Sequence, residues 1–130
     1  MRLWHQKLIP YLPRQQLLGQ HRECCALRGA GWGRKHSVVD YVFTYDPAYL
    51  VAYHYLVMDE MEKRGYHPDP IWRNSNWRGN ILKEDLGWAG DILVQNILLD
   101  KTRNIFLEHN DTYLQECLDN LHNKGIDIEL

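Results

Sequence analysis

The sequence predicts an all-α protein, a single compact domain of three or four helices with long connecting loops. Two observations carry this prediction. Apolar residues recur at helical spacing in several segments, and these segments are bounded by residues that start or stop helices. The length of 130 residues allows one domain with a hydrophobic core and is too short for two ordinary ones, so residues 1–130 are expected to form one unit.

The first helix is expected to begin at Pro13, because the N–H that proline lacks would have no partner at a first helical position. It should run through RQQLLGQHRECCALR, and the glycines at 29, 31 and 33 should end it. One face carries a stripe of residues at helical spacing: Leu17, His21, Cys24 and Arg28.

Two further helices have clear boundaries. Asp46 followed by Pro47 is a strong helix start, and Gly65 should end that helix. The last helix is expected from Asn110 or Asp111 to Lys124, followed by a glycine.

The chain between these helices is harder to interpret. Prolines and glycines break the pattern over residues 66–90, and the tryptophans there are predicted to pin a long loop onto the core. Stacking on nucleic-acid bases is the alternative role for such aromatic residues. The apolar segment 91–107 is expected to form a buried helix.

Composition limits the class of protein. A content of 45% hydrophobic and 25% charged residues is typical of globular proteins. No run of 18 apolar residues exists and the first 15 residues do not resemble a signal peptide, so a cytoplasmic protein with no membrane contact is expected. Three cysteines without metal-ligand spacing are predicted to be small buried residues rather than metal or redox groups.

Charge is distributed unevenly along the chain. The net charge of −2 combines +5 over residues 1–40 with −7 over residues 41–130. A basic third on an acidic remainder can form a one-sided patch for phosphates, although the same residues could simply face solvent on two helices.

The first predicted helix also carries a candidate catalytic carboxylate. Arg22 and Glu23 are adjacent, so their side chains leave the helix about 100° apart. Helical side chains lean toward the N-terminus, and Gly19 would therefore leave open space where the Glu23 carboxylate points. Tight helix packing at Gly19 is the alternative explanation.

These residues resemble the first helix of the bacteriophage endonuclease V family, the pyrimidine-dimer DNA glycosylases with AP lyase activity. The resemblance includes Gln15, Arg22 and Glu23 in this helix, and Arg34-Lys35-His36 after it. A second segment, Val42 to Asp46 followed by a helix ending in Lys63-Arg64-Gly65-Tyr66, is also similar to the family. The opening MRLWH is similar to a branch of short bacterial proteins assigned to it.

The resemblance implies a mechanism. In the family, the N-terminal α-amine attacks C1′ of a damaged nucleotide, a pyrimidine dimer or a related lesion, and forms an imine. Here that amine would belong to Met1, because the bulky Arg2 disfavours removal of the methionine, and Glu23 would assist proton transfer. The residues matched to DNA-binding positions are Arg2, Gln15, Arg22, Arg34, Lys35 and His36.

The expected partner is double-stranded DNA with a damaged or abasic site, and no metal or cofactor is implied. Two alternatives remain: a non-catalytic nucleic-acid-binding module of the same fold, and a protein-interaction adaptor that uses the acidic part of the chain. Seven histidines are scattered along the sequence, and sequence alone does not bring two of them together.

Overall fold

The protein is described here by a computed structural model covering residues 2–34 and 38–130, and the regular secondary structure of these residues is helical. Four helices have nine residues or more: α1 (Arg14–Arg28), α2 (Pro47–Lys63), α4 (Asp91–Leu99) and α5 (Asp111–Asn123). The shorter elements are α3 (Gly79–Leu82) and the 3₁₀ helices Gln6–Tyr11, Asp40–Thr44 and Pro70–Arg73. Within these ranges no β-strand is present beyond one isolated bridge, so the all-α prediction is confirmed.

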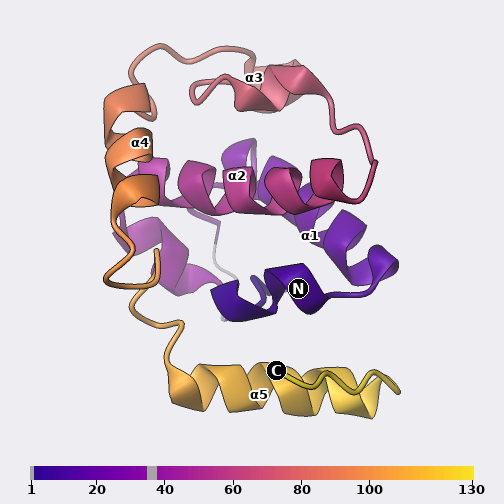
Figure 1. The fold of residues 1–130 in the computed structure, drawn as a ribbon. Coiled ribbons are helices and arrows are strands. Elements are labelled where there is room, and N and C mark those ends of the chain that lie inside the picture. The colour runs from indigo at the N-terminus through magenta and orange to yellow at the C-terminus, as the bar shows by residue number, and fades with distance from the viewer. Residues whose placement is uncertain (1, 35–37) are drawn as a thin grey trace.

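The helix α2 forms the centre of the molecule (Figure 1). It packs against α1, α4 and the two 3₁₀ helices Gln6–Tyr11 and Asp40–Thr44. Ten of its seventeen residues are buried, among them Tyr53, His54 and Met58. A helix surrounded in this way must be apolar on most of its circumference, which explains the nearly continuous run of apolar residues in its sequence.

The predicted boundaries of α1, α2 and α5 are confirmed to within one residue, although Pro13 is the N-cap of α1 and not its first helical residue. Asp46 caps α2 by accepting a hydrogen bond from the N–H of Ala48 at 2.9 Å, and Asn110 caps α5 by accepting one from Tyr113 at 2.9 Å. Gly65 follows α2 with φ of +86°, a left-handed conformation that favours glycine.

Residues 91–107 do not form the single buried helix expected from their sequence. The helix α4 ends at Leu99, and its Ile92 and Leu99 are 80% and 74% exposed. The Asp100 carboxylate accepts a hydrogen bond from the N–H of Thr102 at 3.0 Å, which turns the chain out of the helix. Apolar content alone therefore overestimated both the length and the burial of this helix.

Two of the tryptophans in the loop after α2, Trp72 and Trp88, lie against the core, as predicted. Trp88 packs edge-on against Trp32, with 5.4 Å between ring centroids. The buried Arg28, at the end of α1, fixes the same loop by donating to the carbonyl oxygens of Trp72, Asn74 and Trp77. A long loop is thus held by one side chain that satisfies three buried carbonyl groups.

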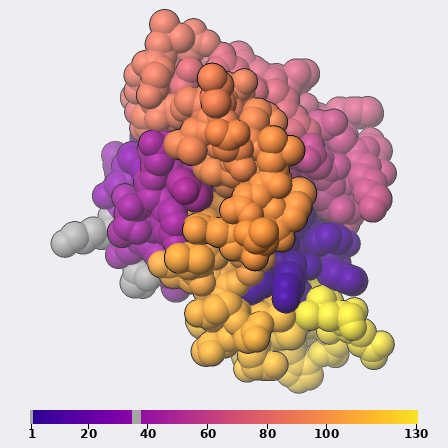
Figure 2. All heavy atoms as spheres, turned by 60° about the vertical axis from the view of Figure 1, so that its left-hand side comes forward, coloured from indigo at the N-terminus to yellow at the C-terminus, as the bar shows by residue number. Residues whose placement is uncertain are grey.

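The helix α5 lies apart from α1 and α2 and runs beside the N-terminal segment (Figure 1). Figure 2 shows N-terminal residues at the surface between the α4 region and the C-terminal part of the chain. In the described ranges, no helix has the length and apolar character needed to cross a membrane.

Candidate active site

The backbone that leads to the N-terminus is fixed by Gln20 of α1. The Gln20 side-chain amide donates to the carbonyl oxygen of Arg2 at 3.0 Å, and its oxygen accepts from the N–H of Trp4 at 2.6 Å. The hydroxyl of Tyr53 shares its proton between the Gln20 oxygen at 2.8 Å and the carbonyl oxygen of Trp4 at 2.6 Å. Burial raises the pKa of Tyr53 well above its usual value, so the phenol remains a donor.

A second set of contacts holds the same segment from the side of α5. The hydroxyl of Tyr113 donates to the carbonyl oxygen of Leu3 at 2.5 Å. The N–H of Gln6 donates to Nδ1 of the buried His109 at 3.1 Å. Residues 2–6 are therefore clamped between α1 and the start of α5, and the position of Arg2 is determined by the tertiary structure.

A groove of about 600 Å³ opens beside this clamped segment. Its walls are the N-terminal segment, one face of α1 and the last turn of α5 with the residue that follows. The lining residues are Arg2, Trp4, Gln16, Gly19, Gln20, Arg22, Glu23, Ala26, Asn120 and Lys124. A groove of this size, lined by charged and aromatic side chains, suits a ligand the size of a nucleotide.

Glu23 is the acidic residue that lines this groove. Glu23 is only 8% exposed, although it borders the open space of the groove. A Cβ added at Gly19 would meet no atom closer than Nη2 of Arg22 at 3.6 Å, which is ordinary contact. Gly19 is therefore not required by tight helix packing, and its missing side chain leaves the groove open next to Glu23, as the sequence suggested.

Three cationic side chains line the groove: Arg2, Arg22 and Lys124. The Arg2 guanidinium lies 5.7 Å from the centroid of the Trp4 ring and 3.5 Å from the carboxylate of Glu116. An ion pair at that distance, with Glu116 59% exposed, contributes little to stability. Arginine suits phosphate binding because its planar guanidinium can donate two parallel hydrogen bonds.

The structure brings together some of the residues predicted for the site and separates others. Arg2, Arg22 and Glu23 all line the groove. Gln15 is exposed on α1 but does not line it, because its neighbour Gln16 occupies that face. Arg34 also lies outside the groove, and its Nε donates to the carbonyl oxygen of Ala30 at 2.9 Å. The predicted residues Met1, Lys35 and His36 lie outside the described residues.

Several groove residues were not found from the sequence. The N–H of Trp4 donates to the side-chain oxygen of Gln20, although the two residues are 16 positions apart in the chain. Asn120 comes from α5 and Lys124 directly follows it, and the sequence there shows only an amphipathic helix. The single available signal was the basic charge of Lys124 at a helix end, which is common and points equally to an interaction with the helix dipole.

The fold and the groove define a small helical protein with a carboxylate and three cations beside its N-terminal segment. The chain matches the sequence model of the family described as pyrimidine dimer DNA glycosylase over residues 1–74, more than half of its length. The chain belongs to the pyrimidine dimer DNA glycosylase family. No curated protein and no solved structure is significantly similar to it.

The family match covers part of the groove. It includes the N-terminal segment and α1, which together supply Arg2, Gln20, Arg22 and Glu23. Asn120 and Lys124 lie beyond the matched residues. The family match therefore implies DNA glycosylase activity at the family level and concerns residues 1–74. The part of the groove wall formed by Asn120 and Lys124 is seen only in the structure.

Proposed function

We propose that this chain is a DNA repair glycosylase and AP lyase that uses its N-terminal α-amine as the nucleophile and Glu23 as the proton-transfer group. One observation carries the proposal. Gln20, which lies one turn before Glu23 on the same face of α1, holds the carbonyl of Arg2 at 3.0 Å. The α-amine belongs to Met1, and two residues of chain, which span at most about 7 Å, separate it from the clamped carbonyl of Arg2, so the clamp limits its distance from the Glu23 groove.

The proposed chemistry needs a neutral amine and a nearby carboxylate. An α-amine has a pKa of about 7.7–8.0, so a useful fraction is neutral at pH 7, unlike a lysine side chain. The amine nitrogen forms a bond to C1′, and the electrons of the glycosidic bond leave with the base, which takes up a proton. Opening of the sugar ring then gives a protonated imine at C1′.

Strand cleavage follows from the imine. Removal of a proton from C2′ pushes electrons toward the imine and expels the 3′ phosphate by β-elimination. A carboxylate at the position of Glu23 can accept that proton and stabilise the cationic imine. Residues Arg2, Arg22 and Lys124 would hold the flanking phosphates, while Gln15, Arg34, Lys35 and His36 remain predicted DNA contacts outside this groove.

The test is borohydride trapping on duplex DNA with a single abasic site, repeated on duplex DNA with one pyrimidine dimer. The protein must carry any tag at its C-terminus so that its amine is free. The expected result is a covalent protein–DNA band that disappears when the α-amine is acetylated. Acetylated protein that still binds the DNA serves as the control for folding.

Two other outcomes would replace the proposal. DNA binding without a covalent band would favour a non-catalytic nucleic-acid-binding module. Absence of both binding and the band would favour a protein-interaction adaptor. Cleavage that survives acetylation would contradict the amine mechanism while leaving the glycosylase family assignment in place.

A further inference from the structure

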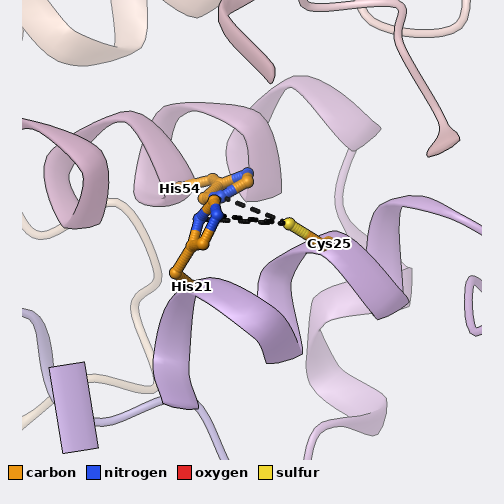
Figure 3. Close-up of side chains that lie close together, drawn as sticks. All are labelled: His21, Cys25 and His54. Atoms are coloured by element: carbon orange, nitrogen blue, oxygen red, sulfur yellow. Dashed lines mark hydrogen bonds between the residues drawn. The ribbon is translucent and has the colours of Figure 1, made fainter. Parts of the chain in front are cut away.

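A cluster of three metal-ligating side chains lies at the interface between α1 and α2, outside the groove. His21 and Cys25 are one turn apart on α1, so they project from the same face of that helix, and His54 faces them from α2 (Figure 3). In the described parts of the chain, this is the one group of three or more such residues with converging ligand atoms. The sequence pattern did not reveal it, because one of its members is 29 residues from its nearest partner.

The distances between the ligand atoms match a metal site. Nδ1 of His21 lies 2.8 Å from Nε2 of His54, and Sγ of Cys25 lies 3.9 Å from the first and 4.0 Å from the second. A point in the plane of these three atoms is about 2.1 Å from each of them, close to the usual metal–nitrogen distance of about 2.0–2.1 Å and metal–sulfur distance of about 2.3 Å. At that point the two nitrogens subtend an angle of only about 83°, so coordination in a plane at about 120° requires them to separate from 2.8 Å to about 3.5 Å, with loss of the His21–His54 hydrogen bond.

The hydrogen bonds of the cluster show which hydrogen atom a bound ion would displace. Arg28 donates from Nη1 to Nδ1 of His54 at 3.0 Å, so the hydrogen of neutral His54 sits on Nε2 and points at His21. An ion at the centre would require that hydrogen to move to Nδ1 and the Arg28–His54 hydrogen bond to break. The N–H of Nδ1 would then face the donor Nη1 of Arg28, so this contact must open, while the carbonyl partners of Arg28 keep its guanidinium hydrogen-bonded.

The charge around the cluster favours a monovalent ion. The charged side chains that act on these three residues are Arg22, Arg28 and Arg73, and all of them are cationic. An ion that binds the Cys25 thiolate displaces the thiol proton, so a monovalent ion leaves the total charge of the cluster unchanged. A divalent ion would add a positive charge beside the buried Arg28.

We propose that His21, Cys25 and His54 form a three-coordinate site for a soft monovalent metal ion, Cu(I). Thiolate and imidazole are ligands that Cu(I) prefers, and it accepts three of them in a plane. A structural zinc site normally has four protein ligands, and this cluster offers three. One proton is released for each ion bound, as the thiol becomes a thiolate. The proposal does not depend on the glycosylase activity.

The test is an anaerobic titration of the full-length protein with Cu(I) against bicinchoninate as a competing chelator. One equivalent of Cu(I) should bind to the wild type, and Cys25→Ala should weaken binding by at least about 100-fold. Cys24→Ala is the matched control, because Cys24 is the next residue on the same helix and does not belong to the cluster. X-ray absorption of the loaded protein should give one sulfur and two nitrogen ligands.

Three results would overturn the proposal. These are equal Cu(I) affinity in Cys25→Ala and wild type, equal losses in the two cysteine variants, and tighter binding of Zn(II) than of Cu(I). Far-UV circular dichroism verifies that each variant is folded. If Cys25→Ala unfolds, His21→Gln replaces it, and the same loss of Cu(I) affinity is expected. An unchanged affinity in that variant would overturn the proposal as well.

Discussion

At the scale of single residues, Glu23 combines burial with access to a groove. Its residue is 8% exposed, and the neighbouring Gly19 leaves the space next to it open. Replacing Glu23 by Gln keeps the shape of the side chain and removes its capacity to accept a proton. We expect strand cleavage at an abasic site to fall by about 10²–10⁴-fold under single-turnover conditions, with the affinity for DNA changed less than about threefold.

The matched control for that variant is Glu129→Gln, which removes one carboxylate from the exposed C-terminal segment. It should cleave at the wild-type rate. Cleavage by Glu23→Gln at the same rate as the control would show that Glu23 has no role in proton transfer.

Gln20 positions the backbone before the groove and does not itself need to react. Its two hydrogen bonds to Arg2 and Trp4 are buried or partly buried, and Tyr53 shares its oxygen. Gln20→Ala leaves the buried N–H of Trp4 without this acceptor, so we expect the free energy of unfolding to fall by about 1–3 kcal/mol. Guanidinium denaturation measures this loss.

The control for Gln20 is Gln16→Ala, one turn earlier on α1 and also in the groove wall. It should change the free energy of unfolding by less than about 0.5 kcal/mol. The yield of borohydride trapping should drop more for Gln20→Ala than for Gln16→Ala, because Gln16 lines the groove but does not hold the backbone of residues 2–4. Equal stability of the two variants would mean that the clamp on Arg2 does not depend on Gln20.

At the scale of elements, α5 completes a groove that α1 alone would leave open. Asn120 of α5 and Lys124, which follows the helix, line the groove together with the cations Arg2 and Arg22. If the groove holds a DNA phosphate, Lys124→Gln should weaken binding and reduce the salt dependence by about one counterion. Fluorescence anisotropy at several salt concentrations measures this slope.

Lys63→Gln is the control for Lys124, since Lys63 is exposed at the end of α2 and does not line the groove. Its salt slope should equal that of the wild type. If the two lysine variants shift the slope by the same amount, the effect comes from net charge and gives no support to a binding role for α5.

At the scale of the whole molecule, buried histidines link the fold to pH. Burial lowers the pKa of His5, His21, His54 and His109, and that of His109 falls to about 3. Nδ1 of His109 accepts the N–H of Gln6, so a proton there would face a donor. The unfolded chain, with histidine pKa values near 6.5, therefore binds more protons than the folded protein as the pH falls below about 6.5.

The expected consequence is acid lability. The stability due to neutral His109 is fully present above about pH 6.5 and is lost as the pH falls from 6.5 toward 3, at up to about 1.4 kcal/mol per pH unit. His109→Gln should be less stable at pH 7.5 but should have a smaller slope between pH 6.5 and 5. The exposed His67→Gln is the control, and identical slopes for all three proteins would contradict this account.

The sequence by itself determined the helical class, the limits of α1, α2 and α5, and the residues Arg22 and Glu23 on one helix. These features follow from local physics: helical periodicity, caps such as Asp46, and glycine after a helix. The family resemblance, confirmed by the match over residues 1–74, indicated the class of function, DNA glycosylase. The early end of α4 at Leu99 was missed, because apolar content does not distinguish a helix from an apolar loop.

Only the tertiary structure decided what lies next to Glu23. Gln20 holds Arg2 across 18 residues of sequence, and Lys124 reaches the same groove from the far end of the chain. The pairing of His54 with His21 and Cys25 likewise depends on how α2 crosses α1. These contacts join residues distant in the chain, and their positions come from the packing of the core, which no local sequence pattern encodes.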